Sequence, residues 1–196
     1  MARNPGEAGM DHQQRETLRV SVQKKYKAVA GVPQGHFPYP VGRESAVRLG
    51  YDRRWIEGVP PQVVEHFVGV GNPLSVCMPQ SGDDVLDVGC GSGFDTYVAW
   101  LKGATSTGID PTAEMLPPAP GTVGFLVARA EELPFEDASF DMVISNGALN
   151  LVPDKDRAYR EIFRVLRVGG TLAVADLLVI ETIPDEVLAD VDAWST

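Results

Sequence analysis

The residues of this chain that most clearly indicate chemistry are an acid followed by three glycines at alternate positions, and a second acid further on. Asp87 stands in an apolar run that leads into Gly89, Gly91 and Gly93. Alternating glycines let another molecule lie directly against the backbone, because no Cβ stands in the way. About twenty residues after the first glycine, Asp110 ends a second short expected strand, residues 105–109, where it can take both hydroxyls of a ribose. The pattern predicts a site for a nucleoside-bearing cofactor.

The glycine spacing separates the possible cofactors. A nicotinamide site uses Gly-x-Gly-x-x-Gly, but the position of the third glycine is Phe94 here. A Walker-type phosphate loop is excluded, because no Gly-Lys-Ser/Thr follows. An acid ahead of the glycines instead suits a cofactor with a free amino group, whose ammonium can hydrogen-bond near Asp87. S-adenosylmethionine has that group. The alternative is an ordinary strand-to-helix turn with no ligand.

Composition narrows the class of protein. A length of 196 residues suits one domain with a sizeable core and room for an appended segment. The formal net charge of −10 argues against a nucleic acid or an anionic membrane as partner. No apolar stretch reaches membrane-spanning length, and the polar N-terminus lacks the apolar middle of a signal peptide. Two cysteines make neither a disulfide framework nor a metal site. We therefore expect a cytoplasmic protein with no bound metal.

Alternating strands and helices must position these residues. Residues 1–15 are expected to be a mobile tail, and residues 16–80 an N-terminal segment of helices and loops. Residues 81–180 alternate in type, which predicts an α/β, Rossmann-like, doubly wound and mainly parallel sheet. The expected strands are residues 85–88, 105–109, 123–127, 140–145 and 171–175. The expected longer helices are residues 16–30, 96–102 and 154–168, the last ended by Gly169 and Gly170.

Two segments depart from the usual course of such a fold. After Asp110, three prolines between residues 117 and 120 limit the following helix to little more than a turn. Residues 181–196 begin a C-terminal segment with another helix near Pro184, and no sequence remains for the two strands that usually follow. We expect either a fragment, possibly truncated after the fifth strand, or a sheet that ends early. An uncovered sheet edge could promote pairing into a homodimer.

Further motifs lie in a fixed order along the chain. With residues 87–95 they include Asp110 and Pro111 and the segments 130–135, 139–143 and 164–170. In this order and spacing they resemble the class I S-adenosylmethionine-dependent methyltransferases. Residues 69–73, 144–151, 153–157 and 183–186 are similar to the arsenite methyltransferase family. This closer resemblance covers roughly residues 50–194.

The resemblance implies S-adenosylmethionine as cofactor and a small molecule as methyl acceptor. The glycine loop and Asp87 would hold the methionine end, Asp110 the ribose and Ala130 the adenine. Asn146 would face the reacting end, because open α/β sheets bind ligands at the carboxyl ends of their strands. The expected cofactor residues are Asp87, Gly89, Cys90, Gly91, Gly93, Asp110, Pro111, Ala130 and Asn146.

Departures from the arsenite family concern its thiolate ligands, which a soft ion such as trivalent arsenic requires. Val70 and Gly147 stand at two positions where that family has cysteines, and the third position falls just past Thr196. Cys90 lies in the cofactor loop, and we interpret Cys77 as a small buried apolar residue. We therefore expect an acceptor other than arsenite.

A second departure concerns the adenine. Related methyltransferases often have an acid just before Ala130 that accepts a hydrogen bond from the adenine amine. This chain has Arg129 there, which carries no acceptor.

The sequence offers fewer candidates for proton transfer than for cofactor binding, and each has a simpler structural interpretation. His66 could be a general base, because histidine as a residue type exchanges protons near neutral pH, but a partly exposed helix histidine is the simpler interpretation. Asp176, after the fifth strand, could face the acceptor or cap a turn. Tyr26 could close over the cofactor or belong to the core. The acidic residues 131–132 and 154–156 are interpreted as solvated helix ends. Two hypotheses follow: a small-molecule methyltransferase, or a non-catalytic relative that keeps the fold as a binding or assembly module.

Overall fold

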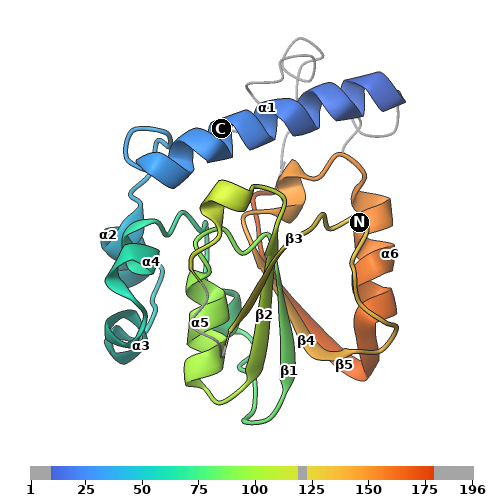
Figure 1. Ribbon diagram of the computed structural model, residues 1–196. Helices are drawn as coiled ribbons and strands as arrows, with labels where there is room; N and C mark the ends of the chain where they lie inside the picture. The colour runs from blue at the N-terminus through green and yellow to red at the C-terminus, as the bar shows by residue number, and fades with distance from the viewer. Residues whose placement is uncertain (1–9, 119–122, 179–196) are drawn as a thin grey trace.

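A five-stranded parallel sheet forms the centre of the computed structural model, which describes residues 10–118 and 123–178. The strand order is β3-β2-β1-β4-β5, and every neighbouring pair runs parallel (Figure 1). The strands are β1 (Asp84–Val88), β2 (Thr105–Asp110), β3 (Gly124–Val127), β4 (Phe140–Asn146) and β5 (Leu166–Ala175). The predicted Rossmann-like α/β sheet is confirmed. The expected start of a C-terminal helix near Pro184 lies outside the described residues.

Six α-helices accompany the sheet within the described residues: α1 (His12–Gly31), α2 (Gly42–Arg48), α3 (Arg53–Gly58), α4 (Pro61–Glu65), α5 (Phe94–Leu101) and α6 (Lys155–Val165). The expected tail is too long, because α1 already begins at His12. Asp11 and Gln14 form a capping box there, each side chain accepting from the other's backbone N–H at 2.8 Å. The helix after Asp110 is limited to one 3₁₀ turn, Ala113–Met115, as the prolines predicted.

The boundary between α6 and β5 corrects one prediction. We expected a helix to Val168 ended by two glycines, but α6 ends at Val165 and Leu166 already pairs with Phe140 of β4. The register shifts between Phe140 and Met142, and Gly169 within the extra length of β5 has a φ of +84°. Gly169 therefore serves an irregular strand, for which a positive φ is inexpensive only in glycine.

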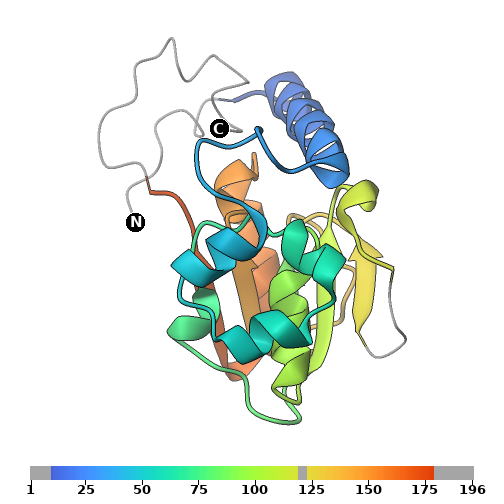
Figure 2. The ribbon, with the colours of Figure 1, turned by 90° about the vertical axis from the view of Figure 1, so that its left-hand side faces the viewer.

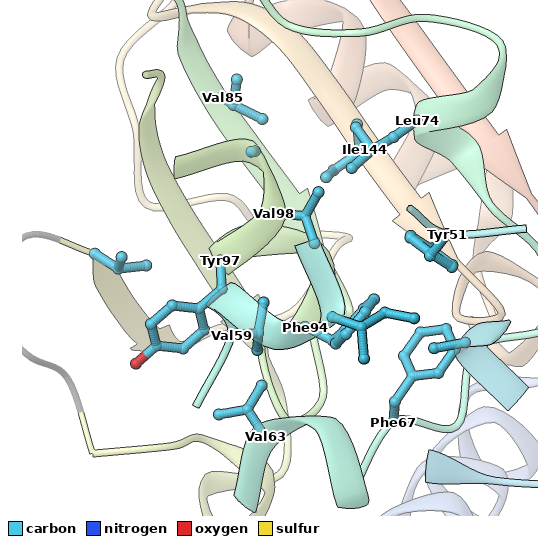
Figure 3. Packing of buried hydrophobic residues seen from close by; sticks show 14 of the residues in the cluster. Tyr51, Val59, Val63, Phe67, Leu74, Val85, Phe94, Tyr97, Val98 and Ile144 are labelled. Carbon is cyan, nitrogen blue, oxygen red and sulfur yellow. The ribbon is translucent and has the colours of Figure 1, made fainter. Parts of the chain in front are cut away.

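Each face of the sheet has its own apolar core. One face packs against α5 and the short helices α2–α4, with Phe67, Phe94 and Ile144 at its centre (Figure 3). The other face packs against α6, which contributes Ile162 and Val165. Successive residues of a strand point to opposite faces, so strands buried on both sides are apolar throughout. A polar residue such as Asp87 inside β1 therefore stands out.

Helix α1 crosses the molecule above the carboxyl ends of the strands, apart from the helices that cover the two faces (Figures 1 and 2). Only Leu18 and Val29 of its residues are buried. In the part of the chain that the structure describes, no helix has the length and hydrophobicity needed to cross a membrane.

Candidate functional site

A cavity lies beneath α1 at the carboxyl ends of β1, β2 and β4. It encloses about 1090 Å³, a volume that includes the part open to solvent. Its walls come from α1, the 66–69 segment, the 87–92 loop and the segments that follow β2, β3 and β4. In an open parallel sheet this is the edge where ligands bind. The fold therefore places the cavity where the sequence predicted a cofactor.

The loop after β1 is held close against β2. The N–H groups of Gly89 and Cys90 both donate to the carbonyl oxygen of Ile109, at 2.8 and 2.9 Å. Gly89 has a φ of +74°, and a Cβ on it would stand 2.2 Å from the Cβ of Ala148. Gly91 has a φ of +52° and donates its N–H to Asp110 at 3.1 Å. The loop thus depends on glycine both for its conformation and for its space.

Three buried aspartates line the cavity: Asp87 at 2%, Asp95 at 5% and Asp110 at 7% exposure. Burial raises the pKa of Asp110 to about 6 and, despite hydrogen bonds from Tyr51 and Asn146, that of Asp95 to about 6. Burial and the neighbouring Asp95 carboxylate raise the pKa of Asp87 well above its usual range. Among the described residues, no Lys, Arg or His forms an ion pair with any of the three. Buried acids without a cation are costly, so the cavity favours a positively charged ligand.

Asn146 is fully occupied by the protein itself. Its Oδ1 accepts from the N–H groups of Val70 and Gly71, at 3.0 and 3.1 Å. Its Nδ2 lies 2.8 Å from the carbonyl oxygen of Gly71, 2.9 Å from Asp95 and 3.1 Å from the Tyr51 hydroxyl. The same hydroxyl donates to Asp95 at 2.6 Å. Asn146 therefore fastens the 69–71 segment to the end of β4 and lines the cavity with its amide groups already bonded.

Four polar side chains at every fourth position fasten α1 to the cavity rim. Arg15 pairs with Asp154 at 2.7 Å, Arg19 with Glu131 at 2.9 Å and Lys27 with Glu114 at 2.6 Å. Gln23 donates to the carbonyl oxygen of Pro111 at 3.1 Å. Spacing of four places these side chains on one face of the helix. These four contacts hold α1 over the cavity, and we call the helix in this position the roof of the cavity.

One of these partners differs from the sequence prediction, and the other has the predicted place at a helix end but an additional ion pair. Glu131 was expected to be a solvated helix end, but it is 6% exposed, lines the cavity and is paired with Arg19. Asp154 caps α6 by accepting from the N–H of Arg157 at 3.1 Å, while its other oxygen takes Arg15. Their partners lie more than a hundred residues earlier in the chain, so no local pattern indicates them.

The cavity brings together most of the residues singled out from the sequence. It is lined by Asp87, Gly89, Cys90, Gly91, Asp110, Pro111, Ala130, Asn146, His66 and Tyr26. Gly93 is absent from that lining: it caps α5 with a φ of +82°, and a Cβ there would stand 2.6 Å from the Phe125 ring. Asp176 also lies outside the lining and caps a turn, accepting from the N–H of Asn150 at 2.8 Å.

The two positions that the arsenite family fills with cysteine are neighbours in space. A Cβ on Gly147 would stand 3.2 and 3.3 Å from the two methyl carbons of Val70. Val70 thus occupies the space into which a side chain at residue 147 would project. Cys77 packs, half-buried, against the core on the α5 face, as expected of a small apolar residue. Cys90 lies against Gly108, and burial raises the pKa of its thiol.

Comparison with known proteins decides the family. The methyltransferase domain family matches residues 86–174, the segment that carries the glycine loop and four of the five strands in full or nearly so. An arsenite methyltransferase of Halobacterium salinarum is 34% identical over 157 residues, covering 74% of this chain and 40% of the relative. The chain belongs to the class I S-adenosylmethionine-dependent methyltransferases. Within them it lies close to the arsenite methyltransferase family.

The similar proteins include one named for a different acceptor and a solved arsenic methyltransferase structure. A 27-O-demethylrifamycin SV methyltransferase of Amycolatopsis mediterranei is 36% identical over 52% of this chain and 41% of the relative. The crystal structure of an arsenic (III) S-adenosylmethionine methyltransferase from Chlamydomonas reinhardtii superposes with a TM-score of 0.60 and 35% identity, covering 69% of this chain and 51% of that one. The chain spans about two fifths of the length of the curated relatives it matches.

The residues of the methyltransferase cavity fit the cofactor of the family. S-adenosylmethionine carries an ammonium and a sulfonium, which suit a cavity with three buried aspartates that no cation among the described residues pairs with. The Asp110 carboxylate ends β2 and keeps lone pairs beyond those used by Gly91 and Thr112. Gly89 and Gly91 have no side chain that would keep a ligand away from the loop backbone at these two positions.

Proposed function

We propose that this protein binds S-adenosylmethionine in the cavity beneath α1 and transfers its methyl group to a small-molecule acceptor other than arsenite. One observation carries the proposal. Asp87 and Asp110 lie in the last two residues of adjacent parallel strands, both are buried, and the loop after Asp87 has glycine at positions 89 and 91 and bonds to Asp110. An ammonium at Asp87 and ribose hydroxyls at Asp110 would satisfy both groups.

The cofactor supplies, when bound, a methyl group already activated by a sulfonium. The protein then has to hold two molecules in line and exclude water, and such positioning provides most of the acceleration. Asp87 and the glycine loop hold the methionine end, and Asp110 holds the ribose. Apolar residues of the wall, Val22, Leu151 and Val152, exclude water from the reacting end.

Proton removal from the acceptor falls to His66 in this proposal. Of the two candidates for proton transfer, His66 and Asp176, only His66 lines the cavity. Its Nδ1 lies 2.8 Å from the carbonyl oxygen of Gln62, so the neutral ring donates there and leaves Nε2 as the proton acceptor. A residue with that tautomer can take a proton from a hydroxyl or amine.

The contact between Val70 and Gly147 supports an acceptor other than arsenite. Neither side chain has a sulfur, and the valine methyl groups fill the space between the two positions. A soft trivalent ion would find no thiolate at either position. Incubation with arsenite, cofactor and reductant, followed by detection of methylated arsenic, tests this point. Clear turnover would contradict the proposal.

Calorimetric titration with S-adenosylmethionine tests the proposal as a whole. Binding in the micromolar range that is abolished in Asp87→Ala supports a cofactor site. Absence of heat at millimolar cofactor would contradict the enzyme and support a non-catalytic relative that keeps the fold for binding or assembly.

A further inference from the structure

A tight turn after β3 brings a hydrogen-bond donor and an acceptor to the cavity side by side. The N–H of Glu132 donates to the carbonyl oxygen of Arg129 at 3.1 Å, so Ala130 and Glu131 are the central residues of this turn. They are 7% and 6% exposed, and both line the cavity. Among the described residues, no group accepts from the N–H of Ala130. The turn therefore presents an unused donor to the cavity.

The acceptor beside it is the carboxylate of Glu131. One of its oxygens takes the guanidinium of Arg19 at 2.9 Å, and Arg19 is itself held by Glu16 at 3.1 Å. The second oxygen has no donor from the part of the chain that the structure describes. The Arg129 side chain offers donors only. Glu131 is thus the carboxylate that this turn presents, and Arg19 is the residue that orients it.

The position of the turn in the sheet indicates which part of a ligand it meets. The order β3-β2-β1 places three features in a row along the carboxyl edge: Asp87 on β1, Asp110 on β2 and the Ala130–Glu131 pair after β3. A ligand with its ammonium at Asp87 and its ribose at Asp110 extends toward the turn. The base attached to the ribose is the group that arrives there.

We propose that Glu131 recognises adenine, accepting a hydrogen bond from the 6-amino group while the N–H of Ala130 donates to the ring nitrogen N1. This inference rests on the proposed function and adds to it the residue that selects the base. The Watson–Crick edge of adenine carries an acceptor next to a donor, which matches the donor and acceptor of the turn. A base with an oxygen at position 6 would set an acceptor against the carboxylate and is rejected.

Calorimetry with S-adenosylhomocysteine tests the assignment without any methyl acceptor. The matched ligand is the analogue in which hydrogen replaces the 6-amino group and N1 is unchanged. The wild type is expected to bind the analogue about tenfold more weakly, the cost of one charge-assisted hydrogen bond. Glu131→Met is expected to bind both ligands with dissociation constants within about twofold. The control Glu132→Met, at a side chain 84% exposed, keeps the tenfold ratio.

The same tenfold ratio in Glu131→Met, or equal binding of both ligands by the wild type, would overturn the assignment. Circular dichroism shows whether Glu131→Met is folded. If it is not, Glu131→Gln decides: its neutral amide is a weaker acceptor, so the ratio should fall to about threefold, and an unchanged ratio overturns the assignment. A wild type that binds neither ligand contradicts the proposed function itself.

Discussion

Asn146 holds Gly71 by both of its backbone groups, accepting from the N–H at 3.1 Å and lying 2.8 Å from the carbonyl oxygen as donor. The side-chain amide thus makes the two backbone hydrogen bonds with Gly71 that a neighbouring strand would make in a sheet. It also bonds to Asp95, which burial would otherwise leave with the Tyr51 hydroxyl alone. One residue at the end of β4 therefore fixes the cavity wall formed by residues 69–71.

Removal of this amide should destabilise the fold. Asn146→Ala leaves the N–H groups of Val70 and Gly71 without their acceptor and the Gly71 carbonyl oxygen with the Tyr51 hydroxyl alone. We expect a loss of about 2 kcal/mol in the free energy of unfolding. Denaturant unfolding with circular dichroism measures the loss. Asn150→Ala, on the turn that follows β4, is the control, because no described group bonds the Oδ1 of that side chain. Equal losses in both variants would contradict the role of Asn146.

The glycine loop offers a prediction with a matched control. Gly89 and Gly82 have φ values of +74° and +92°, but a Cβ on Gly89 meets Ala148 at 2.2 Å while one on Gly82 meets nothing within 4 Å. Gly82→Ala should therefore cost only the left-handed backbone penalty of about 1 kcal/mol. Gly89→Ala should cost at least about twice as much and abolish binding of S-adenosylhomocysteine. Thermal unfolding and calorimetry measure the two effects, and equal behaviour of the variants would refute the close approach.

The roof formed by α1 should respond to the loss of a single rim contact. Arg19→Met removes the pair with the buried Glu131, so we expect S-adenosylhomocysteine to bind about tenfold more weakly. Arg48→Met is the control, because its pair with Glu44 is exposed on both sides. Hydrogen exchange should also be faster along α1 in Arg19→Met than in the control. Identical dissociation constants for the two variants would contradict a roof that contributes to binding.

Asp110 makes the stability of the ligand-free protein depend on pH. Burial raises its pKa to about 6, so the folded state holds this proton over a range where the unfolded state has released it. Its stabilising contribution is complete below about pH 4 and is lost as the pH rises through about 6. The wild type should gain more stability than Asp110→Asn between about pH 7 and pH 5, measured by thermal unfolding. Asp95, whose pKa burial also raises to about 6, keeps part of the effect in both proteins. An equal gain in stability in the wild type and in Asp110→Asn would contradict this role of Asp110.

The central strands β1 and β4 could be predicted from sequence because they are buried on both faces. Residues 85–88 and 140–145 are nearly continuous apolar runs, and the structure places β1 and β4 there. The end of α6 could not be predicted, because Leu166 to Val168 suit a helix as well as a strand and only pairing with Phe140 decides between them. Helix α3 could not be predicted as a separate helix either, because its six residues are too few to show a periodic pattern.

The candidate site also contains residues that the sequence indicates and residues that it does not. Asp87, Gly89 and Asp110 lie within local motifs, so their spacing alone indicates a cavity for a cofactor. Glu131 and Arg19 have no local signal, because their contact joins residues 112 apart in the sequence. Asp95 was visible in the glycine motif, but its bonds to Tyr51 and Asn146 depend on tertiary packing.

Titration of the wild type and Asp87→Asn with S-adenosylmethionine tests the central claim most directly. Asp87 is buried in the cavity and accepts a hydrogen bond from Thr96 at 2.6 Å. The control is Asp137→Asn, because Asp137 precedes the start of β4, away from the cavity, and its side chain is 80% exposed. The account predicts micromolar binding by the wild type and the control, and a loss of at least about a hundredfold in Asp87→Asn. Equal binding by all three proteins, or none by the wild type, would contradict it.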